Sequence, residues 1–142
     1  MRQSLQFSPE QASVREARDF ARESAVSLGA SSDAGDTLAL VVDELVNNSI
    51  EHGAVYRKHA ALLSLSVSVE DAEVSVEFID PDMPPTMVSE LARMLGCSPE
   101  GLPAAENERG RGLFLISIFL VDIAVGLAAG GGLRLRGRLQ QR

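Results

Sequence analysis

The hydrophobic pattern of the chain changes its period near residue 60, and this change limits the folds that the chain can adopt. Before it, apolar residues recur every three or four positions, as on a helix that buries one face. After it, "LLSLSVSV" (62–69) and "VSVEFID" (74–80) alternate apolar with polar residues. Alternation with a period of two is typical of strands, and the short "EDAE" between the two segments predicts an antiparallel pair.

Two helices are predicted before the change of period. The segment "SPEQ" (8–11) has the form of a capping box with proline in the first turn. We therefore expect a first helix from about Pro9 to Leu28, with Gly29 ending it. The segment "ASSDAGD" (30–36) offers N-caps for a second helix, which should run through Leu38, Val42 and Leu45 and stop at Gly53.

The second half of the chain is less regular. From Pro81 to Arg109 it contains prolines and one short amphipathic piece, "MVSELARML", and a loop of this length usually serves as a lid or a binding loop. "GLFLISIFLV" (112–121) is apolar on every side, which predicts a buried helix. "DIAVGL" (122–127) and "LRLRGRL" (133–139) predict a final hairpin. In its last strand the leucines should point inward and the arginines toward solvent: Leu133, Leu135 and Leu139 against Arg134, Arg136 and Arg138.

This order of elements predicts the fold class. Two helices come first, followed by strands that pair mainly antiparallel, with a possible edge strand near Leu5 and Phe7. Such a chain is expected to form an α+β fold, a two-layer sandwich with helices on one face of the sheet. Its 142 residues suit a single domain that spans residues 1–142.

Composition excludes several kinds of partner and site. A net charge of -7 argues against nucleic acid or an anionic membrane as the main target, because both attract a surplus of Lys and Arg. The single cysteine, Cys97, excludes an internal disulfide and a Cys-rich zinc site. The first residues lack the apolar core of a signal peptide, and no apolar run is long enough to span a membrane. We therefore expect a cytoplasmic protein.

A polar stripe marks the second half of the second predicted helix. In "VVDELVNNSIEHG" (41–53) the polar residues recur at intervals of three and four, so they share one helix face. They are Glu44, Asn47, Asn48, Glu51 and His52. Glu44 can accept a proton from a hydroxyl group, and the neighbouring amide oxygen of Asn48 is a suitable ligand for Mg²⁺. A stripe of this kind is also ordinary on the wet face of a surface helix.

Asp80 ends the second predicted strand, in "FIDPDMPP". A carboxylate at a strand end that opens onto a loop is well placed to accept a hydrogen bond from a ligand. The same residue, with Asp82, can equally serve only to build the turn.

A glycine-rich segment, "ERGRGLFLI", precedes the apolar helix. Glycines let the backbone approach a phosphate closely, and a helix N-terminus attracts negative charge. Two arginines add full positive charges. The four residues that form this possible phosphate site are Arg109, Gly110, Arg111 and Gly112. A flexible linker that needs glycine to turn would look the same.

Together and in this order, the three segments resemble the ATP-binding fold shared by histidine kinases, gyrase and MutL. The chain is most similar to the small single-domain branch, the bacterial anti-sigma factor serine/threonine kinases. "DELVNNSIEHG" resembles the family's N box, "FIDPDMPP" its first glycine box and "RGRGLFLI" its second. The resemblance extends over almost the whole chain, and the N box is its most specific part.

The resemblance implies ATP and Mg²⁺ as ligands and a role for each matching residue. Glu44 matches the catalytic base that activates the attacking hydroxyl group, and Asn48 matches the Mg²⁺ ligand. Asp80 matches the aspartate that accepts the adenine amino group. Gly110 and Gly112 match the glycines that wrap the phosphates, Arg109 or Arg111 would neutralise the γ-phosphate, and residues 83–109 would form the ATP lid. Asn47 and His52 would lie near the phosphates.

The resemblance also implies a function. A protein of this family would phosphorylate a serine or threonine of a STAS-domain anti-sigma factor antagonist, sequester a sigma factor, and act as a homodimer. One departure supports an alternative, a regulator that binds a partner without catalysis: Asp82 stands where the family has glycine, and its charge would weaken nucleotide binding. A nucleic-acid contact through the three arginines of the last hairpin is disfavoured, since no aromatic residues accompany them.

Overall fold

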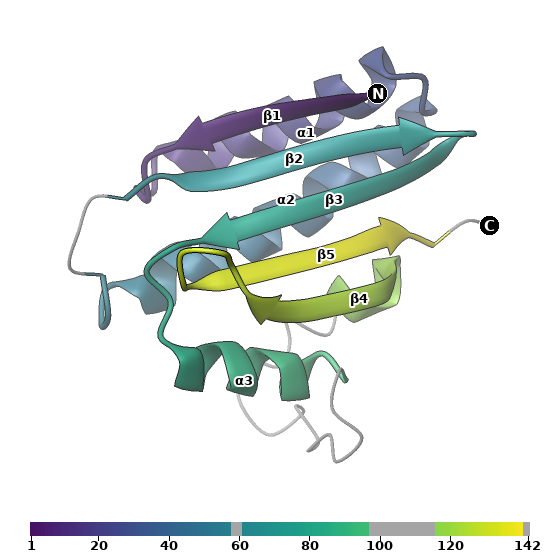
Figure 1. Cartoon of the computed structure of the whole chain (residues 1–142). Helices are drawn as coiled ribbons and strands as arrows, with labels where there is room; N and C mark the ends of the chain where they lie inside the picture. The colour runs from purple at the N-terminus through teal and green to yellow at the C-terminus, as the bar shows by residue number, and fades with distance from the viewer. Residues whose placement is uncertain (58–60, 97–115, 141–142) are drawn as a thin grey trace.

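The computed structural model describes residues 1–57, 61–96 and 116–140 (Figure 1). Its helices and strands follow one another in the order β1 (Arg2–Phe7), α1 (Ser13–Ser27), α2 (Ser32–Gly53), β2 (Leu63–Glu70), β3 (Glu73–Asp80), α3 (Pro85–Met94), β4 (Leu120–Leu127) and β5 (Leu133–Leu139).

The strands form one five-stranded sheet in the order β1-β2-β3-β5-β4, and every neighbouring pair is antiparallel. Figure 1 shows α1 and α2 crossing one face of this sheet, behind it in that view, while α3 lies beside β4 at one edge. The expected fold class is therefore confirmed: an α+β sandwich with one helical layer on an antiparallel sheet.

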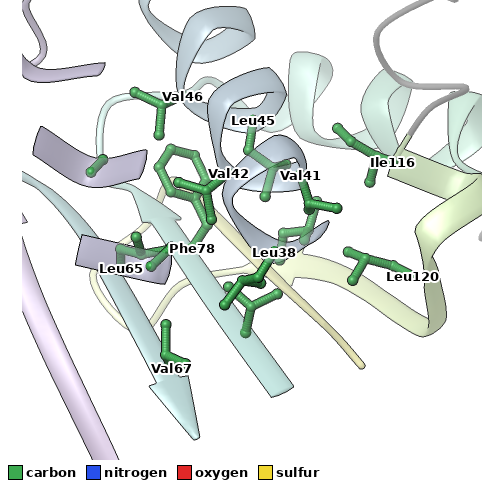
Figure 2. Close-up of a cluster of buried hydrophobic side chains, with 14 of the residues drawn as sticks. Leu38, Val41, Val42, Leu45, Val46, Leu65, Val67, Phe78, Ile116 and Leu120 are labelled. Atoms are coloured by element: carbon green, nitrogen blue, oxygen red, sulfur yellow. The ribbon is translucent and has the colours of Figure 1, made fainter. Parts of the chain in front are cut away.

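The core lies between α2 and the sheet. On α2, residues four apart, such as Leu38, Val42 and Val46, are fully buried. The alternating residues of β2, together with Phe78 of β3, face them (Figure 2). Because the apolar side of α2 is fixed against the sheet, its polar stripe faces away from the core.

Several local predictions are confirmed. The Ser31 hydroxyl oxygen caps α2 by accepting a hydrogen bond from the Ala34 N–H at 3.1 Å, and the helix ends at Gly53. Asp71 and Ala72 both have positive φ, as a tight two-residue turn between β2 and β3 requires. The inward leucines of β5 are buried. None of the helices in the described segments is long and apolar enough to cross a membrane.

The predicted start of the first helix is wrong. The helix begins at Ser13 rather than Pro9, and its N-cap residue, Ala12, provides no side-chain hydrogen bond. Phe7 is buried and paired with Leu63 at the end of β1, so the chain stays extended up to that point. The following residues form turns that reverse its direction, with the Glu10 N–H bonded to the Ser8 carbonyl at 2.8 Å.

The apolar segment 112–121 also differs from its prediction. Its first four residues lie outside the described part of the chain; residues 116–119 are helical, and β4 already begins at Leu120. Ile118 is 40% exposed, so this segment is not buried on every side. An apolar run does not reveal where a helix gives way to a strand, and here the pairing of Leu120 with Leu139 fixes that boundary.

The turn between β4 and β5 packs against the end of β3. Gly132 has a φ of +86°, and a Cβ atom at this position would overlap the Asp80 carbonyl oxygen and lie 2.5 Å from the Cα of Pro81. Both the backbone conformation and the lack of space therefore require glycine.

We expect Gly132→Ala to destabilise the protein by about 1–3 kcal/mol, because alanine is strained at this φ and has no room for its methyl group. Gly130→Ala is the matched control in the same turn, since a Cβ there meets nothing within 4 Å. Urea unfolding of both variants measures the difference. Equal midpoints for the two would contradict the role given to Gly132.

Candidate functional site

Asp80 is fully buried at the end of β3 and is surrounded by hydrogen-bond donors. Its Oδ2 accepts from the Tyr56 hydroxyl at 2.6 Å, from Arg57 Nη2 at 2.9 Å and from the Ser49 hydroxyl. Its Oδ1 accepts from Arg57 Nη1 and from the Asp82 backbone N–H, each at 3.1 Å. The helix, the segment after it and the turn after β3 therefore meet at one carboxylate.

The surroundings keep this carboxylate charged. Burial raises the pKa of Asp80, but hydrogen bonds from Arg57, Ser49 and Tyr56 outweigh that effect and hold the pKa below its usual range. Burial lowers the pKa of Arg57, whereas its bonds and attraction to Asp80 raise it, with a net increase. Burial and the bond to Asp80 raise the pKa of Tyr56, so its hydroxyl stays protonated and donates.

Arg57 is held from several sides, and only 12% of its side chain is exposed. Besides the two bonds to Asp80, its Nη2 donates to the Ser49 carbonyl at 3.3 Å, and its Nη1 lies 3.5 Å from Asp82 Oδ2. Its guanidinium carbon lies 5.2 Å from the centre of the Tyr56 ring. Gly53 makes room for it, since a Cβ at residue 53 would lie 2.5 Å from Nη2.

Glu44 and Asn48 are half-buried on α2, about one helical turn apart. Within the described ranges, neither side chain forms a hydrogen bond or an ion pair with another residue. Ser49, the next residue, contacts Asp80. The helix therefore places a free carboxylate and a free amide close in sequence to the buried cluster, and both remain available to a ligand.

Asn47 and His52 lie at the two borders of the polar stripe. The Asn47 Oδ1 accepts a hydrogen bond from Gln11 at 3.1 Å, and its Nδ2 donates to Asp43 at 3.3 Å. Asn47 is thus directed toward the beginning of α1, while His52 is half-buried near the end of α2. Their placement near the phosphates stays a prediction.

The possible phosphate site at Arg109, Gly110, Arg111 and Gly112 lies outside the described residues, which end at 96 and resume at 116. The first part of the expected lid is described. It contains α3, whose Val88 and Leu91 are buried against the core together with Met83 before it. The part of the expected lid that the structure describes is therefore packed against the core.

Acidic residues accompany the arginines of the open sheet face. Arg134 pairs with Glu77 at 2.8 Å and Arg138 with Glu73 at 3.1 Å; Arg2 of β1 also pairs with Glu77, at 3.1 Å. Paired arginines attract a polyanion weakly, so these ion pairs do not favour a nucleic-acid contact. Arg136, between Arg134 and Arg138 in the sequence, has no ion-pair partner among the described residues.

Part of the site fits Mg²⁺ and ATP, and part does not in this conformation. In the described part of the chain no group of three or more His, Cys, Asp or Glu residues could hold a metal by itself. Mg²⁺ commonly takes one or two protein ligands and completes its shell with phosphates and water, so the free Asn48 amide fits that role. Asp80, in contrast, has no room for another donor while Arg57 is bound to it.

Three residues of the cluster were missed by the sequence reasoning: Ser49, Tyr56 and Arg57. Ser49 sits on the buried side of α2, where a serine gives no signal of its partner. Tyr56 and Arg57 follow the helix end as "VYR", a segment without periodicity. A tyrosine next to an arginine after a glycine that ends a helix was the only available hint.

The fold and the cluster define a class: an α+β domain in which one helix carries an acid and an amide, close to an aspartate at a strand end. The chain belongs to the histidine kinase-like ATPase domain family, whose match extends over residues 7–136. A chain in the crystal structure of the SiaB–SiaC complex from Pseudomonas aeruginosa has a similar fold, with a TM-score of 0.71 and 16% sequence identity. The similarity covers 96% of this chain and 88% of that one. None of the curated proteins matches the sequence.

The buried ion pair should make stability depend on pH. Because the folded-state pKa of Asp80 is lowered, its contribution is complete above the unfolded-state pKa of about 3.9 and is lost as the pH falls through the folded value. We expect Asp80→Asn to be less stable by about 3 kcal/mol at neutral pH, since Arg57 loses the nearer of its two charged partners. The free energy of unfolding, measured from pH 7 down to pH 2, should then fall less steeply below about pH 4 in the variant. Parallel curves for wild type and variant would show that Asp80 does not carry this dependence.

Proposed function

We propose that the protein is an ATP-dependent serine/threonine kinase of a partner-switching system. It would phosphorylate a STAS-domain anti-sigma factor antagonist in the cytoplasm and sequester a sigma factor, acting as a homodimer. The observation that carries this proposal is the pair Glu44 and Asn48, which are half-buried and have no side-chain partner among the described residues. Membership of the histidine kinase-like ATPase family supports it. The fold similarity to a chain of the SiaB–SiaC complex is consistent with a protein partner.

Each residue has a limited task in this reaction. The Asn48 amide oxygen would hold the magnesium, which supplies charge neutralisation to the triphosphate. The Glu44 carboxylate would orient the substrate hydroxyl group and accept its proton while the γ-phosphoryl passes to the substrate oxygen and ADP leaves. Phosphoryl transfer depends mainly on the positions of the reacting groups and on charge neutralisation. A rigid helix that carries both Glu44 and Asn48 would hold them in fixed positions for the reaction.

Glu44→Gln tests catalysis separately from binding. The variant keeps the size and polarity of the side chain but accepts a proton poorly, so we expect phosphate transfer to fall by about 10²–10⁴-fold while ATP affinity stays within about threefold. Transfer is measured with γ-labelled ATP and the STAS-domain proteins of the same organism, and affinity by calorimetry.

Glu51→Gln is the matched control, because Glu51 lies two turns further along the same helix face and is exposed. It should transfer phosphate at the wild-type rate. Unchanged transfer in Glu44→Gln would refute the role of Glu44 as base.

Asn48→Ala tests the magnesium site. ATP binding by the wild type should strengthen by about tenfold or more when Mg²⁺ is added, and the variant should lose this gain because it lacks the amide oxygen. Calorimetric titration with ATP in Mg²⁺ and in EDTA measures both. An equal magnesium effect in the two proteins would exclude Asn48 as a ligand.

The second candidate is a regulator that binds its partner without transferring phosphate. The observation that favours it is that Asp80 is already occupied: its hydrogen bonds to Arg57 leave no free acceptor for the adenine base of a nucleotide. If the protein is such a regulator, the wild type and the Glu44→Gln variant would bind the partner equally well. Neither would transfer the labelled γ-phosphate of ATP to it.

A further inference from the structure

The acceptor capacity of Asp80 is exhausted within the described structure. A carboxylate offers about four lone-pair positions, and five hydrogen bonds already point at this one. Two of them come from a single guanidinium group, in the two-pronged geometry that makes such pairs strong. An additional donor, such as the amino group of a base, can bind only after one of these donors leaves.

Arg57 is the donor that can leave at least cost to the fold. The Asp82 donor is a backbone N–H, Ser49 lies on the buried side of α2, and Tyr56 is a buried core residue. Arg57 instead reaches the carboxylate through a long side chain from the segment after α2, and part of that side chain is exposed. Its guanidinium group keeps its charge and its five N–H donors, which water can satisfy once the group is released, whereas the apolar tyrosine ring would be exposed to water at a cost.

We infer that Arg57 occupies the position at Asp80 where the adenine base of a nucleotide would bind. Arg57 competes with the nucleotide for Asp80 and thereby sets the affinity of the protein for the nucleotide. This inference rests on the proposed function, since it takes Asp80 as the group that receives the base. In the closed state described here Arg57 fills this position. A nucleotide binds by replacing the guanidinium group with its base, and the measured affinity is reduced by the small fraction of open molecules.

Asp82 then acts through Arg57. Its carboxylate lies 3.5 Å from Arg57 Nη1, so it provides a second anchor for the guanidinium group. Its negative charge is paired with this arginine and is not simply exposed to the phosphates. Asp82, which stands where the family has glycine, therefore acts together with Arg57 to keep Asp80 occupied.

Electrostatic attraction alone predicts the opposite effect on ligand affinity when Arg57 is removed. If Arg57 served to attract the triphosphate, its removal would weaken the binding of every polyphosphate. If it competes with the base, its removal strengthens the binding of ATP but not of inorganic tripolyphosphate, which has no base. The ratio of the two affinities therefore separates the explanations.

The experiment is calorimetric titration of the wild type, Arg57→Ala and Asp82→Asn with Mg²⁺·ATP and with Mg²⁺·tripolyphosphate. In the wild type we expect similar affinities for both ligands, because the adenine base adds little binding free energy while Arg57 occupies Asp80. In Arg57→Ala the affinity for ATP should rise by about tenfold or more relative to tripolyphosphate. Asp82→Asn should change the ratio in the same direction by about threefold, since it removes only one anchor of Arg57.

Asp82→Asn also guards against loss of folding, because it leaves Asp80 with all its donors; thermal unfolding shows which variants are folded. If the folded variants bind ATP no better than the wild type relative to tripolyphosphate, Arg57 does not compete with the base and the inference is wrong. In that case the proposed kinase function would not be contradicted, provided that the wild type binds ATP. If neither ligand binds to any form at millimolar concentration, the nucleotide site and the inference both fail.

Discussion

The packing of α2 on the sheet is the interaction on which the rest of the structure depends. Leu38, Val42 and Val46 on one side of this helix are held against the alternating apolar residues of the sheet. This contact fixes the rotation of the helix about its own axis. Its rotation in turn directs Ser49 toward Asp80 and leaves Glu44 and Asn48 on the half-buried border. Hydrophobic burial thus determines the geometry of the polar site without any polar contact having to provide it.

The features that were predictable from sequence are those that periodicity or local turn chemistry controls. The strands of the central hairpin alternate strictly, and the hydroxyl group of Ser31 caps the start of α2. The start of α1 was not predictable, because the capping pattern at Ser8 competes with a tertiary pairing between Phe7 and Leu63 that no local pattern reveals. Pairing across the sheet also decided where the helical residues 116–119 give way to β4.

The candidate site divides in the same way. Asp80, Glu44 and Asn48 could be chosen from sequence because each occupies a special position in an element: a strand end or one helix face. Their surroundings could not. The partners of Asp80 come from residues 49, 56, 57 and 82, and only the folded chain brings these together. A charge that looked unfavourable in the sequence, that of Asp82, has an internal cation beside it in the fold.

Gly53 links the end of α2 to the position of Arg57 beside Asp80. Gly53 does not have a positive φ, and Ala54 after it is also right-handed helical, so position 53 does not need glycine for its backbone freedom. What position 53 provides is space beside the guanidinium group. A single methyl group at this point would push Arg57 outward without altering any residue that touches a ligand. If Arg57 competes with the nucleotide as inferred above, ligand affinity would change through a position that contacts no ligand and that the sequence marks only as the end of a helix.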